Sequence, residues 1–276
     1  MMRFGSTFLF PLHHAGLAAA LVLALGLAGC KTLNMGDVTG SIGASQTQPQ
    51  SPEALRAFAE DWGKRFEANP ADKTAALTYA RALRATTQYN QAAAVLQTAV
   101  LKHPADKEVA GAYGKALADA GRLQEAATVL NGAHSPDRPN WSILSTQGSV
   151  ADQMGDHAQA QTFYIEALKI VPGEPSVMSN LGLSYALAKD LPRAETTMRA
   201  ATADPRADAR VRQNLALVLA LQGKFGEAEE LSRRDLTPDQ ASANVMSIRN
   251  MIAQSNTWRD IQKLDTGKVV AHRKDG

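Results

Sequence analysis

Few residues of this chain have the type and spacing that catalysis or metal binding requires. The 276-residue sequence has six histidines and one cysteine, Cys30. It contains no H-E-x-x-H motif and no close carboxylate–histidine cluster, so metal catalysis has no support. A G-x-S-x-G nucleophile elbow and a phosphate-binding glycine loop are missing as well. The sequence therefore predicts no enzyme and no cofactor, and we interpret His103 and His157 as solvated residues beside a proline and a turn.

Cys30 has the most specific expected chemistry. Ala15 to Ala28 is an uninterrupted run of alanine, leucine, valine and glycine that follows a single charge, Arg3. Such a run is typical of a secretory signal and is shorter than the ~20 residues of a spanning helix. It ends in Leu27-Ala28-Gly29-Cys30, which resembles a bacterial lipobox. The resemblance implies that residues 1–29 are removed and that Cys30 is acylated, the alternative being an uncleaved anchor with an incidental cysteine.

The expected anchor also suggests a location. Several acyl chains hold a protein firmly on a membrane, at ~0.8 kcal/mol for each buried methylene. The residue after Cys30 is Lys31 rather than aspartate, which by resemblance to other lipoproteins favours the outer membrane, with the protein facing the periplasm. Without residues 1–29 the chain keeps 28 basic and 27 acidic residues. This near-neutral balance, with no run of lysine or arginine, gives no reason to expect a nucleic-acid partner.

Behind the cysteine, residues 30–51 are rich in glycine, serine and glutamine, which predicts a lipidated flexible tether. The remaining chain is organised by a repeat. Asn180-Leu181-Gly182-Leu183-Ser184-Tyr185-Ala186-Leu187 recurs 34 residues later as Asn214-Leu215-Ala216-Leu217-Val218-Leu219-Ala220-Leu221. This period is similar to that of the tetratricopeptide repeat, a helix–turn–helix unit. On this register, repeats start at Lys73, Lys107, Trp141, Pro175 and Ala209 without a gap.

Two positions of every repeat carry only glycine or alanine, as closely approaching helices require. The eighth position reads Ala80, Gly114, Gly148, Gly182 and Ala216, and the twentieth reads Ala92, Ala126, Ala160, Ala194 and Ala228. Large apolar residues recur at the eleventh and twenty-fourth positions, which predicts a packed helical seam. The sequence thus predicts an all-α solenoid of about five repeats over residues 71–237.

The turns and ends fit the same register. Gly121, Gly155 and Gly223 stand where a helix commonly ends in a left-handed residue, whereas Thr87 and Lys189 depart from glycine and predict strained or differently closed turns. Residues 52–70 form a predicted N-terminal capping helix, and residues 238–258 a C-terminal one that begins after Thr237. Residues 259–276 form a polar tail that we expect to fray.

The surface lined by the first helices of the repeats is the candidate binding site. In tetratricopeptide proteins, positions 2, 5, 9, 12 and 13 point into a concave groove, and here they run from basic through hydroxylated, with Asp152 among them, to apolar. Such a gradient suits a peptide segment. The candidate residues are Leu77, Arg81, Arg84, Lys115, Ser145, Ser149, Asn180, Leu183, Leu187, Arg210, Asn214, Leu217 and Leu221.

Asn180 and Asn214, at the sixth position, have two possible roles. They could hydrogen-bond the main chain of a bound peptide, or they could only cap or solvate their helices. The carboxylate clamp of chaperone-binding relatives needs lysine and asparagine at positions 5 and 9, where this chain has Ser145 and Ser149. This departure argues against capture of a C-terminal carboxylate.

The C-terminal part resembles one family more closely. The run from Gln213 to Gly223, followed by Phe225-Gly226-Glu227-Ala228-Glu229 and the stretch from Asp235 to Val245, is similar to the TadD lipoproteins of tight-adherence (Flp pilus) systems. The closing Asn256-Thr257-Trp258 also fits. The resemblance spans nearly the whole chain, and its specific part is residues 213–258.

This resemblance implies a pilotin-like scaffold that helps the outer-membrane secretin, or another component of the pilus and secretion apparatus, to assemble. The expected partners are thus proteins, together with the membrane that holds the acyl chains. The alternative is a tetratricopeptide lipoprotein that serves β-barrel insertion or cell-wall enzymes.

Overall fold

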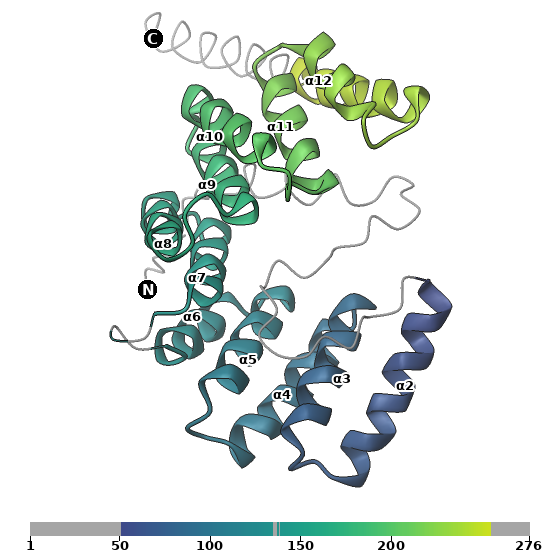
Figure 1. Ribbon diagram of the computed structural model, residues 1–276, viewed down its shortest axis with the longest axis vertical. Helices are drawn as coiled ribbons and strands as arrows, with labels where there is room; N and C mark the ends of the chain where they lie inside the picture. The colour runs from purple at the N-terminus through teal and green to yellow at the C-terminus, as the bar shows by residue number, and fades with distance from the viewer. Residues whose placement is uncertain (1–50, 135–136, 138, 255–276) are drawn as a thin grey trace, which may run out of the picture. The chain divides into compact units, whose positions relative to one another are not determined.

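The computed structural model describes residues 51–134, 137 and 139–254, and all regular structure in these ranges is helical. The predicted signal peptide, Cys30, most of the tether and the tail lie outside the described residues. Figure 1 shows the helices following one another in antiparallel pairs. The pairs are α3 (Lys73–Ala85) with α4 (Tyr89–Lys102), α5 (Lys107–Asp119) with α6 (Leu123–Gly132), α7 (Trp141–Gln153) with α8 (His157–Ile170), α9 (Pro175–Leu187) with α10 (Leu191–Ala203), and α11 (Ala209–Leu221) with α12 (Phe225–Ser232).

These five pairs confirm the predicted repeat solenoid. The first helices begin at Lys73, Lys107, Trp141, Pro175 and Ala209, the residues that the 34-residue register gives. Four of these starts have a side-chain cap, because the carboxylate or amide of the preceding residue accepts hydrogen bonds from the first turn. The capping residues are Asp72, Asp106, Asn140 and Asp208.

The small residues lie where paired helices touch. A Cβ atom placed on Gly148 would lie 2.6 Å from the ring of Tyr164, and one on Gly114 would lie 2.5 Å from Leu130. The alanines at the twentieth position are fully buried in all five repeats. A larger side chain at either position would force the two helices of a repeat apart.

The inter-helix turns share one backbone conformation even where glycine is missing. Gly121, Gly155 and Gly223 have φ between 74° and 85°, and Thr87 and Lys189 adopt the same left-handed region with φ of 60° and 67°. A left-handed conformation costs a residue with a side chain about 1–2 kcal/mol. The expected strain at Thr87 and Lys189 is therefore present.

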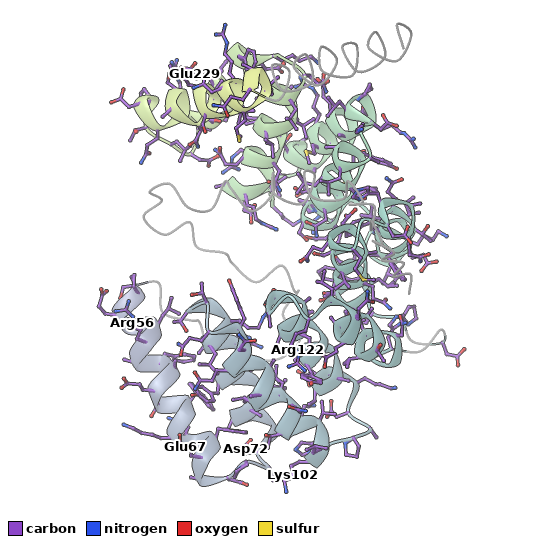
Figure 2. The ribbon with its side chains drawn as sticks, turned by 180° about the vertical axis from the view of Figure 1, so that it is seen from behind. Arg56, Glu67, Asp72, Lys102, Arg122 and Glu229 are labelled. Atoms are coloured by element: carbon purple, nitrogen blue, oxygen red, sulfur yellow. The ribbon has the colours of Figure 1, made fainter. Side chains whose placement is uncertain are left out.

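Both ends of the array carry an additional helix. α2 (Pro52–Ala68) begins after Ser51, whose side chain accepts from the amide of Ala54, and it buries Trp62. Its other face is charged, with Arg56 and Glu67 exposed (Figure 2). At the other end residues 238–254 are helical, and Thr237 and Gln240 hold each other's backbone amides at 3.4 and 3.1 Å in a capping box.

The apolar core consists of three clusters along the array. The first extends from α3 to α7, the second joins α7, α8 and α9, and the third joins α10 and α11 to the helix at 238–254. Each repeat therefore depends on its neighbours for burial, as in other solenoids.

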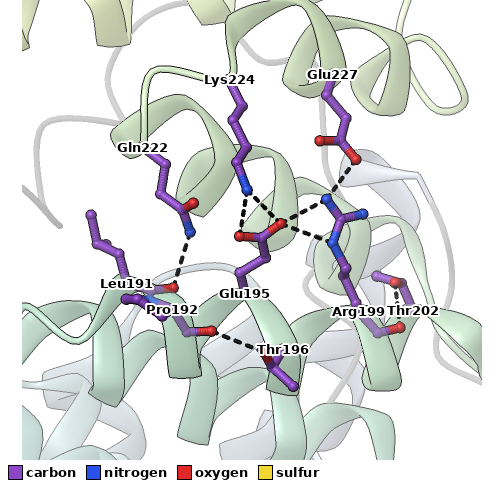
Figure 3. Close-up of polar contacts among 9 residues, drawn as sticks. All are labelled: Leu191, Pro192, Glu195, Thr196, Arg199, Thr202, Gln222, Lys224 and Glu227. Carbon is purple, nitrogen blue, oxygen red and sulfur yellow. Dashed lines mark hydrogen bonds and ion pairs between the residues drawn. The ribbon is translucent and has the colours of Figure 1, made fainter.

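An ion network ties the second helices of the last two repeats (Figure 3). The carboxylate of Glu195 on α10 accepts hydrogen bonds from Lys224 at 2.7 and 2.8 Å and from Arg199 at 2.8 Å. Arg199 also bonds Glu227 on α12 at 2.6 Å. The Lys224 ammonium is the main reason why the pKa of Glu195 falls from 4.5 to about 2.

Replacing Glu195 with glutamine is expected to destabilise the protein at neutral pH by about 1 kcal/mol, because Lys224 and Arg199 are partly solvated and water screens the pair. The folded-state pKa of Glu195 is depressed, so its contribution is present above pH 4.5 and is lost as the pH falls towards 2. Urea unfolding at about pH 7, 4.5 and 3 measures the difference between wild type and variant.

Glu229→Gln is the matched control, because Glu229 pairs with Arg233, the residue that caps the C-terminus of the same helix. It should cost less than about 0.5 kcal/mol. A difference between wild type and Glu195→Gln that stays constant over this pH range would contradict the role of the Glu195 charge.

Candidate protein-binding surface

The first helices of neighbouring repeats lie side by side and form the surface that carries the candidate residues. α3 contacts α5, α5 contacts α7, α7 contacts α9, and α9 contacts α11. The side chains at equivalent positions of these helices therefore form rows that run from one repeat to the next.

Four leucines form an apolar patch on the last two first helices. Leu183 and Leu187 lie on α9, and Leu217 and Leu221 occupy the same positions of α11. All four are partly exposed, and all but Leu187 pack against the third core cluster. We call these four residues the leucine patch. It offers apolar surface held on two adjacent helices.

Beside the leucine patch, two asparagines each form a hydrogen bond to the preceding repeat. Asn180 Nδ2 donates to Ser145 Oγ at 3.3 Å, and Asn214 Nδ2 donates to Ser179 Oγ at 3.0 Å. Within the described ranges, neither Asn Oδ1 atom accepts a hydrogen bond from protein. Both side chains are partly exposed. Each amide is thus oriented by a serine and retains an acceptor, which suits a peptide main chain.

Some of the basic residues expected on the binding surface form hydrogen bonds within the protein. Arg84 Nε donates to Asp119 Oδ2 at 2.5 Å, linking α3 to α5, and Lys115 Nζ donates to Ser142 Oγ at 2.7 Å, linking α5 to α7. Arg81 is exposed, and Leu77 packs against the first core cluster. Two of the expected cations, Arg84 and Lys115, thus already join neighbouring repeats.

The remaining candidates differ in how accessible they are. Ser145 is buried, so it supports Asn180 and cannot itself contact a partner. Ser149 is partly exposed and accepts from Gln153 at 3.4 Å. Arg210 is partly exposed, and its nearest carboxylate, that of Asp208, lies 3.9 Å away.

One polar residue contradicts the sequence-based prediction, and a second has an unpaired buried atom. The sequence predicts Asp152 on the binding surface, but its side chain is only 9% exposed and is bonded to residues of α8 and α9. Gln213, at the fifth position of α11, has a buried Nε2 without a hydrogen-bond partner. The inward position of Asp152 could be predicted by comparing the repeats position by position. The equivalent residues of the neighbouring repeats are alanines, Ala118 and Ala186, which indicates a position that faces other helices.

The described part of the chain holds no group of three or more histidine, cysteine, aspartate or glutamate side chains that could bind a metal ion. No helix within the same residues has the length and apolar character needed to cross a membrane.

The comparisons with known proteins agree with the repeat architecture. A sequence profile of the tetratricopeptide repeat matches residues 77–139 and 145–208, so this part of the chain consists of tetratricopeptide repeats. No curated protein sequence matches it. It is similar to the crystal structure of PilW, a widely conserved type IV pilus biogenesis factor, with a TM-score of 0.61 and 16% identity over 70% of this chain and 91% of that one.

Two further solved structures share the fold over part of their length. The APC/C hetero-tetramer Cut9–Hcn1 matches with a TM-score of 0.56 and 17% identity, over 70% of this chain and 40% of that one. A human IFIT1 dimer with m7Gppp-AAAA matches with a TM-score of 0.58 and 14% identity, over 76% of this chain and 52% of that one. At such identities these likenesses concern the fold alone. Tetratricopeptide proteins bind protein partners, and this class of function is the one that the fold supports.

Proposed function

We propose that this protein is a non-enzymatic scaffold, anchored in the outer membrane and facing the periplasm, that binds a segment of a partner protein for assembly of the Flp pilus. The observation that carries the binding role is the leucine patch beside the two serine-oriented asparagines, Asn180 and Asn214. Apolar side chains of the partner pack on the leucines, at about 25 cal/mol for each Å² buried. The asparagine oxygens accept hydrogen bonds from the partner's main chain.

The pilus assignment rests on the resemblance of residues 213–258 to TadD lipoproteins. The partner under this proposal is the secretin or another pilus component. The similarity to PilW is compatible with such a role, although it concerns the fold. The anchor is the acylated Cys30, and nucleic acid has no part in the function.

A second candidate keeps the same surface and anchor but changes the partner. A tetratricopeptide lipoprotein could serve β-barrel insertion or the regulation of cell-wall enzymes with the same fold. The sequence of the C-terminal part favours the pilus. Identification of the partner separates the two.

The test is a crosslinked pull-down of the acylated protein from membranes, with the recovered proteins identified by mass spectrometry. Recovery of secretin or pilus subunits supports the pilus proposal. Recovery of β-barrel assembly proteins or peptidoglycan enzymes in their place overturns it and favours the second candidate.

Changing Leu183, Leu187, Leu217 and Leu221 to serine is expected to reduce recovery of the partner at least about tenfold, since losing even one buried side chain removes more than 1.4 kcal/mol. Three of these leucines also pack against the core, so far-UV circular dichroism must show unchanged helicity. Leu187→Gln provides a milder second variant, because Leu187 lies outside the core clusters.

The matched control changes exposed apolar residues elsewhere. Leu101 on α4 is 77% exposed and Ile165 on α8 is 43% exposed, so changing both to glutamine removes apolar surface outside the leucine patch. This control should bind as wild type does. Equal recovery with the leucine variants and with wild type would remove the leucine patch from the binding site.

A further inference from the structure

A largely buried carboxylate joins three helices at the junction between the third and fourth repeats. Asp152 Oδ1 on α7 accepts from Ser184 Oγ on α9 at 2.8 Å and lies 2.9 Å from His157 Nδ1 on α8. Asp152 Oδ2 accepts from the hydroxyl of Tyr164, also on α8, at 3.2 Å. The Asp152 side chain is only 9% exposed. We call these four residues the Asp152 cluster.

The Asp152 cluster recurs at neither of the two adjacent junctions. The same four repeat positions are apolar at the junction before it and at the junction after it. The equivalents are Ala118, Leu123, Leu130 and Val150 between the second and third repeats, and Ala186, Leu191, Met198 and Val218 between the fourth and fifth. Apolar residues at these positions are therefore sufficient to pack two repeats of this array together. The polar residues of the Asp152 cluster are not needed for packing alone.

Burial dominates the electrostatics of the Asp152 carboxyl. Loss of hydration raises its pKa above the ordinary 3.8, and hydrogen bonds from His157, Ser184 and Tyr164 offset only part of this effect. Burial also raises the pKa of the Tyr164 hydroxyl well above 10, so this group remains a donor at every physiological pH.

The surrounding helices offer no other charge to compensate Asp152. α8 presents His157 and Tyr164, while α9 has no charged residue and presents Ser184 and Tyr185. Ionisable groups of α5 and α6 are bonded to residues other than Asp152. Lys115 bonds Ser142, Asp119 bonds Arg84, and Glu125 bonds Arg122. The ionised carboxylate therefore depends on its three donors.

We infer that the junction between the third and fourth repeats is a proton-sensitive joint, which opens more readily when Asp152 is ionised and closes more firmly when Asp152 is protonated. Its effect on partner binding rests on the proposed function. α7 and α9 carry the two ends of the Ser145–Asn180 hydrogen bond, so opening the joint displaces Asn180 from the arrangement that it shares with Asn214. A partner that needs both asparagines binds more tightly as the pH falls.

The direction of the pH effect on the opening equilibrium follows from proton linkage. Opening exposes Asp152 to water and returns its pKa towards 3.8, whereas the closed joint holds the pKa above that value. The closed form therefore binds protons more tightly, and acidification favours it. The opening equilibrium changes by up to about tenfold for each unit of pKa difference between the closed and open forms. The change begins at the raised pKa and is complete near pH 3.8.

Hydrogen exchange of the full chain between about pH 4 and about pH 7.5 measures the opening of the joint directly. The observed rates are divided by the intrinsic exchange rates at each pH. Protection of amides in α7 and α9 is expected to rise on acidification relative to amides in α3 and α4. The reference amides correct for effects that are common to the whole chain, and the Asp152→Asn variant separates the titration of Asp152 from that of other groups.

Three variants identify the proton-binding group. Asp152→Asn should make the relative protection independent of pH. His157→Gln should keep the dependence and move it to higher pH, because Asp152 loses a donor that favours its ionised form. Glu166→Gln, on the exposed face of α8, should behave as wild type does.

A pH dependence that persists in Asp152→Asn, or one that vanishes in His157→Gln, assigns the proton to another group and overturns the inference. Protection of α7 and α9 that falls on acidification overturns it as well. The measurement needs no binding partner. Its failure therefore leaves the proposed binding surface intact, and a failed pull-down leaves the joint intact.

Discussion

Replacing Gly148 with alanine is expected to destabilise the protein by about 2–3 kcal/mol, although alanine is the better helix former by about 1 kcal/mol. The added methyl would lie 2.6 to 2.9 Å from three ring atoms of Tyr164. Tyr164 is buried and its hydroxyl is bonded to Asp152, so the ring cannot move aside without breaking that contact. Urea unfolding followed by circular dichroism measures the effect.

Two other glycines provide comparisons. At Gly182 the methyl would lie 2.5 Å from Met198 Cγ and 3.3 Å from the backbone oxygen of Ala194, so Gly182→Ala should also be destabilising. Gly226 on α12 has nothing within 4 Å of the added atom, and Gly226→Ala should be neutral or stabilising by up to about 1 kcal/mol. Equal effects of Gly148→Ala and Gly226→Ala would show that α7 and α8 do not approach as closely as described.

Replacing Cys30 with serine is expected to move the protein from the membrane fraction to the soluble fraction. Under the proposed anchoring the Cys30 thiol receives the lipid, and a serine hydroxyl cannot take its place, so the variant loses the ~0.8 kcal/mol of each buried methylene. Because several acyl chains act together, the effect should be nearly complete. Fractionation of cells, followed by immunoblotting of both fractions, measures it.

Lys31→Asp is the matched control, since it changes the neighbouring residue and leaves the cysteine in place. By resemblance to other lipoproteins, this variant should stay acylated and be retained in the inner membrane. Continued recovery of Cys30→Ser with membranes would mean that the anchor is another part of the chain.

The repeat register could be derived from the sequence because steric exclusion restricts the residue type at fixed positions of each repeat. Only glycine or alanine fits where two helices of a repeat touch, and this restriction at Gly148 and Ala160 recurs in every repeat. The helix starts followed from the same register and from capping residues such as Asp72 and Asp106. Local rules of this kind need no knowledge of how the repeats stack.

Contacts between repeats could not be derived in the same way. The Asn180–Ser145 and Asn214–Ser179 bonds join residues 35 positions apart, one more than the repeat length, because neighbouring first helices are staggered. The sequence alone does not supply this stagger. For the same reason Asp152 was expected on the surface, whereas its carboxylate points towards α8 and α9.

The stagger also accounts for an unpaired polar group near the C-terminal end of the array. Each bonded pair joins the fifth position of one repeat to the sixth position of the next, so the following bond would run from Gln213 to the residue 34 positions after Asn214. That residue is Ile248, which is buried in the C-terminal helix and cannot accept a hydrogen bond. The Gln213 amide is accordingly left without a partner, at a cost of about 1–3 kcal/mol. Ile248, in place of an asparagine, therefore ends this short polar series, and the C-terminal helix covers the last repeat with apolar contact.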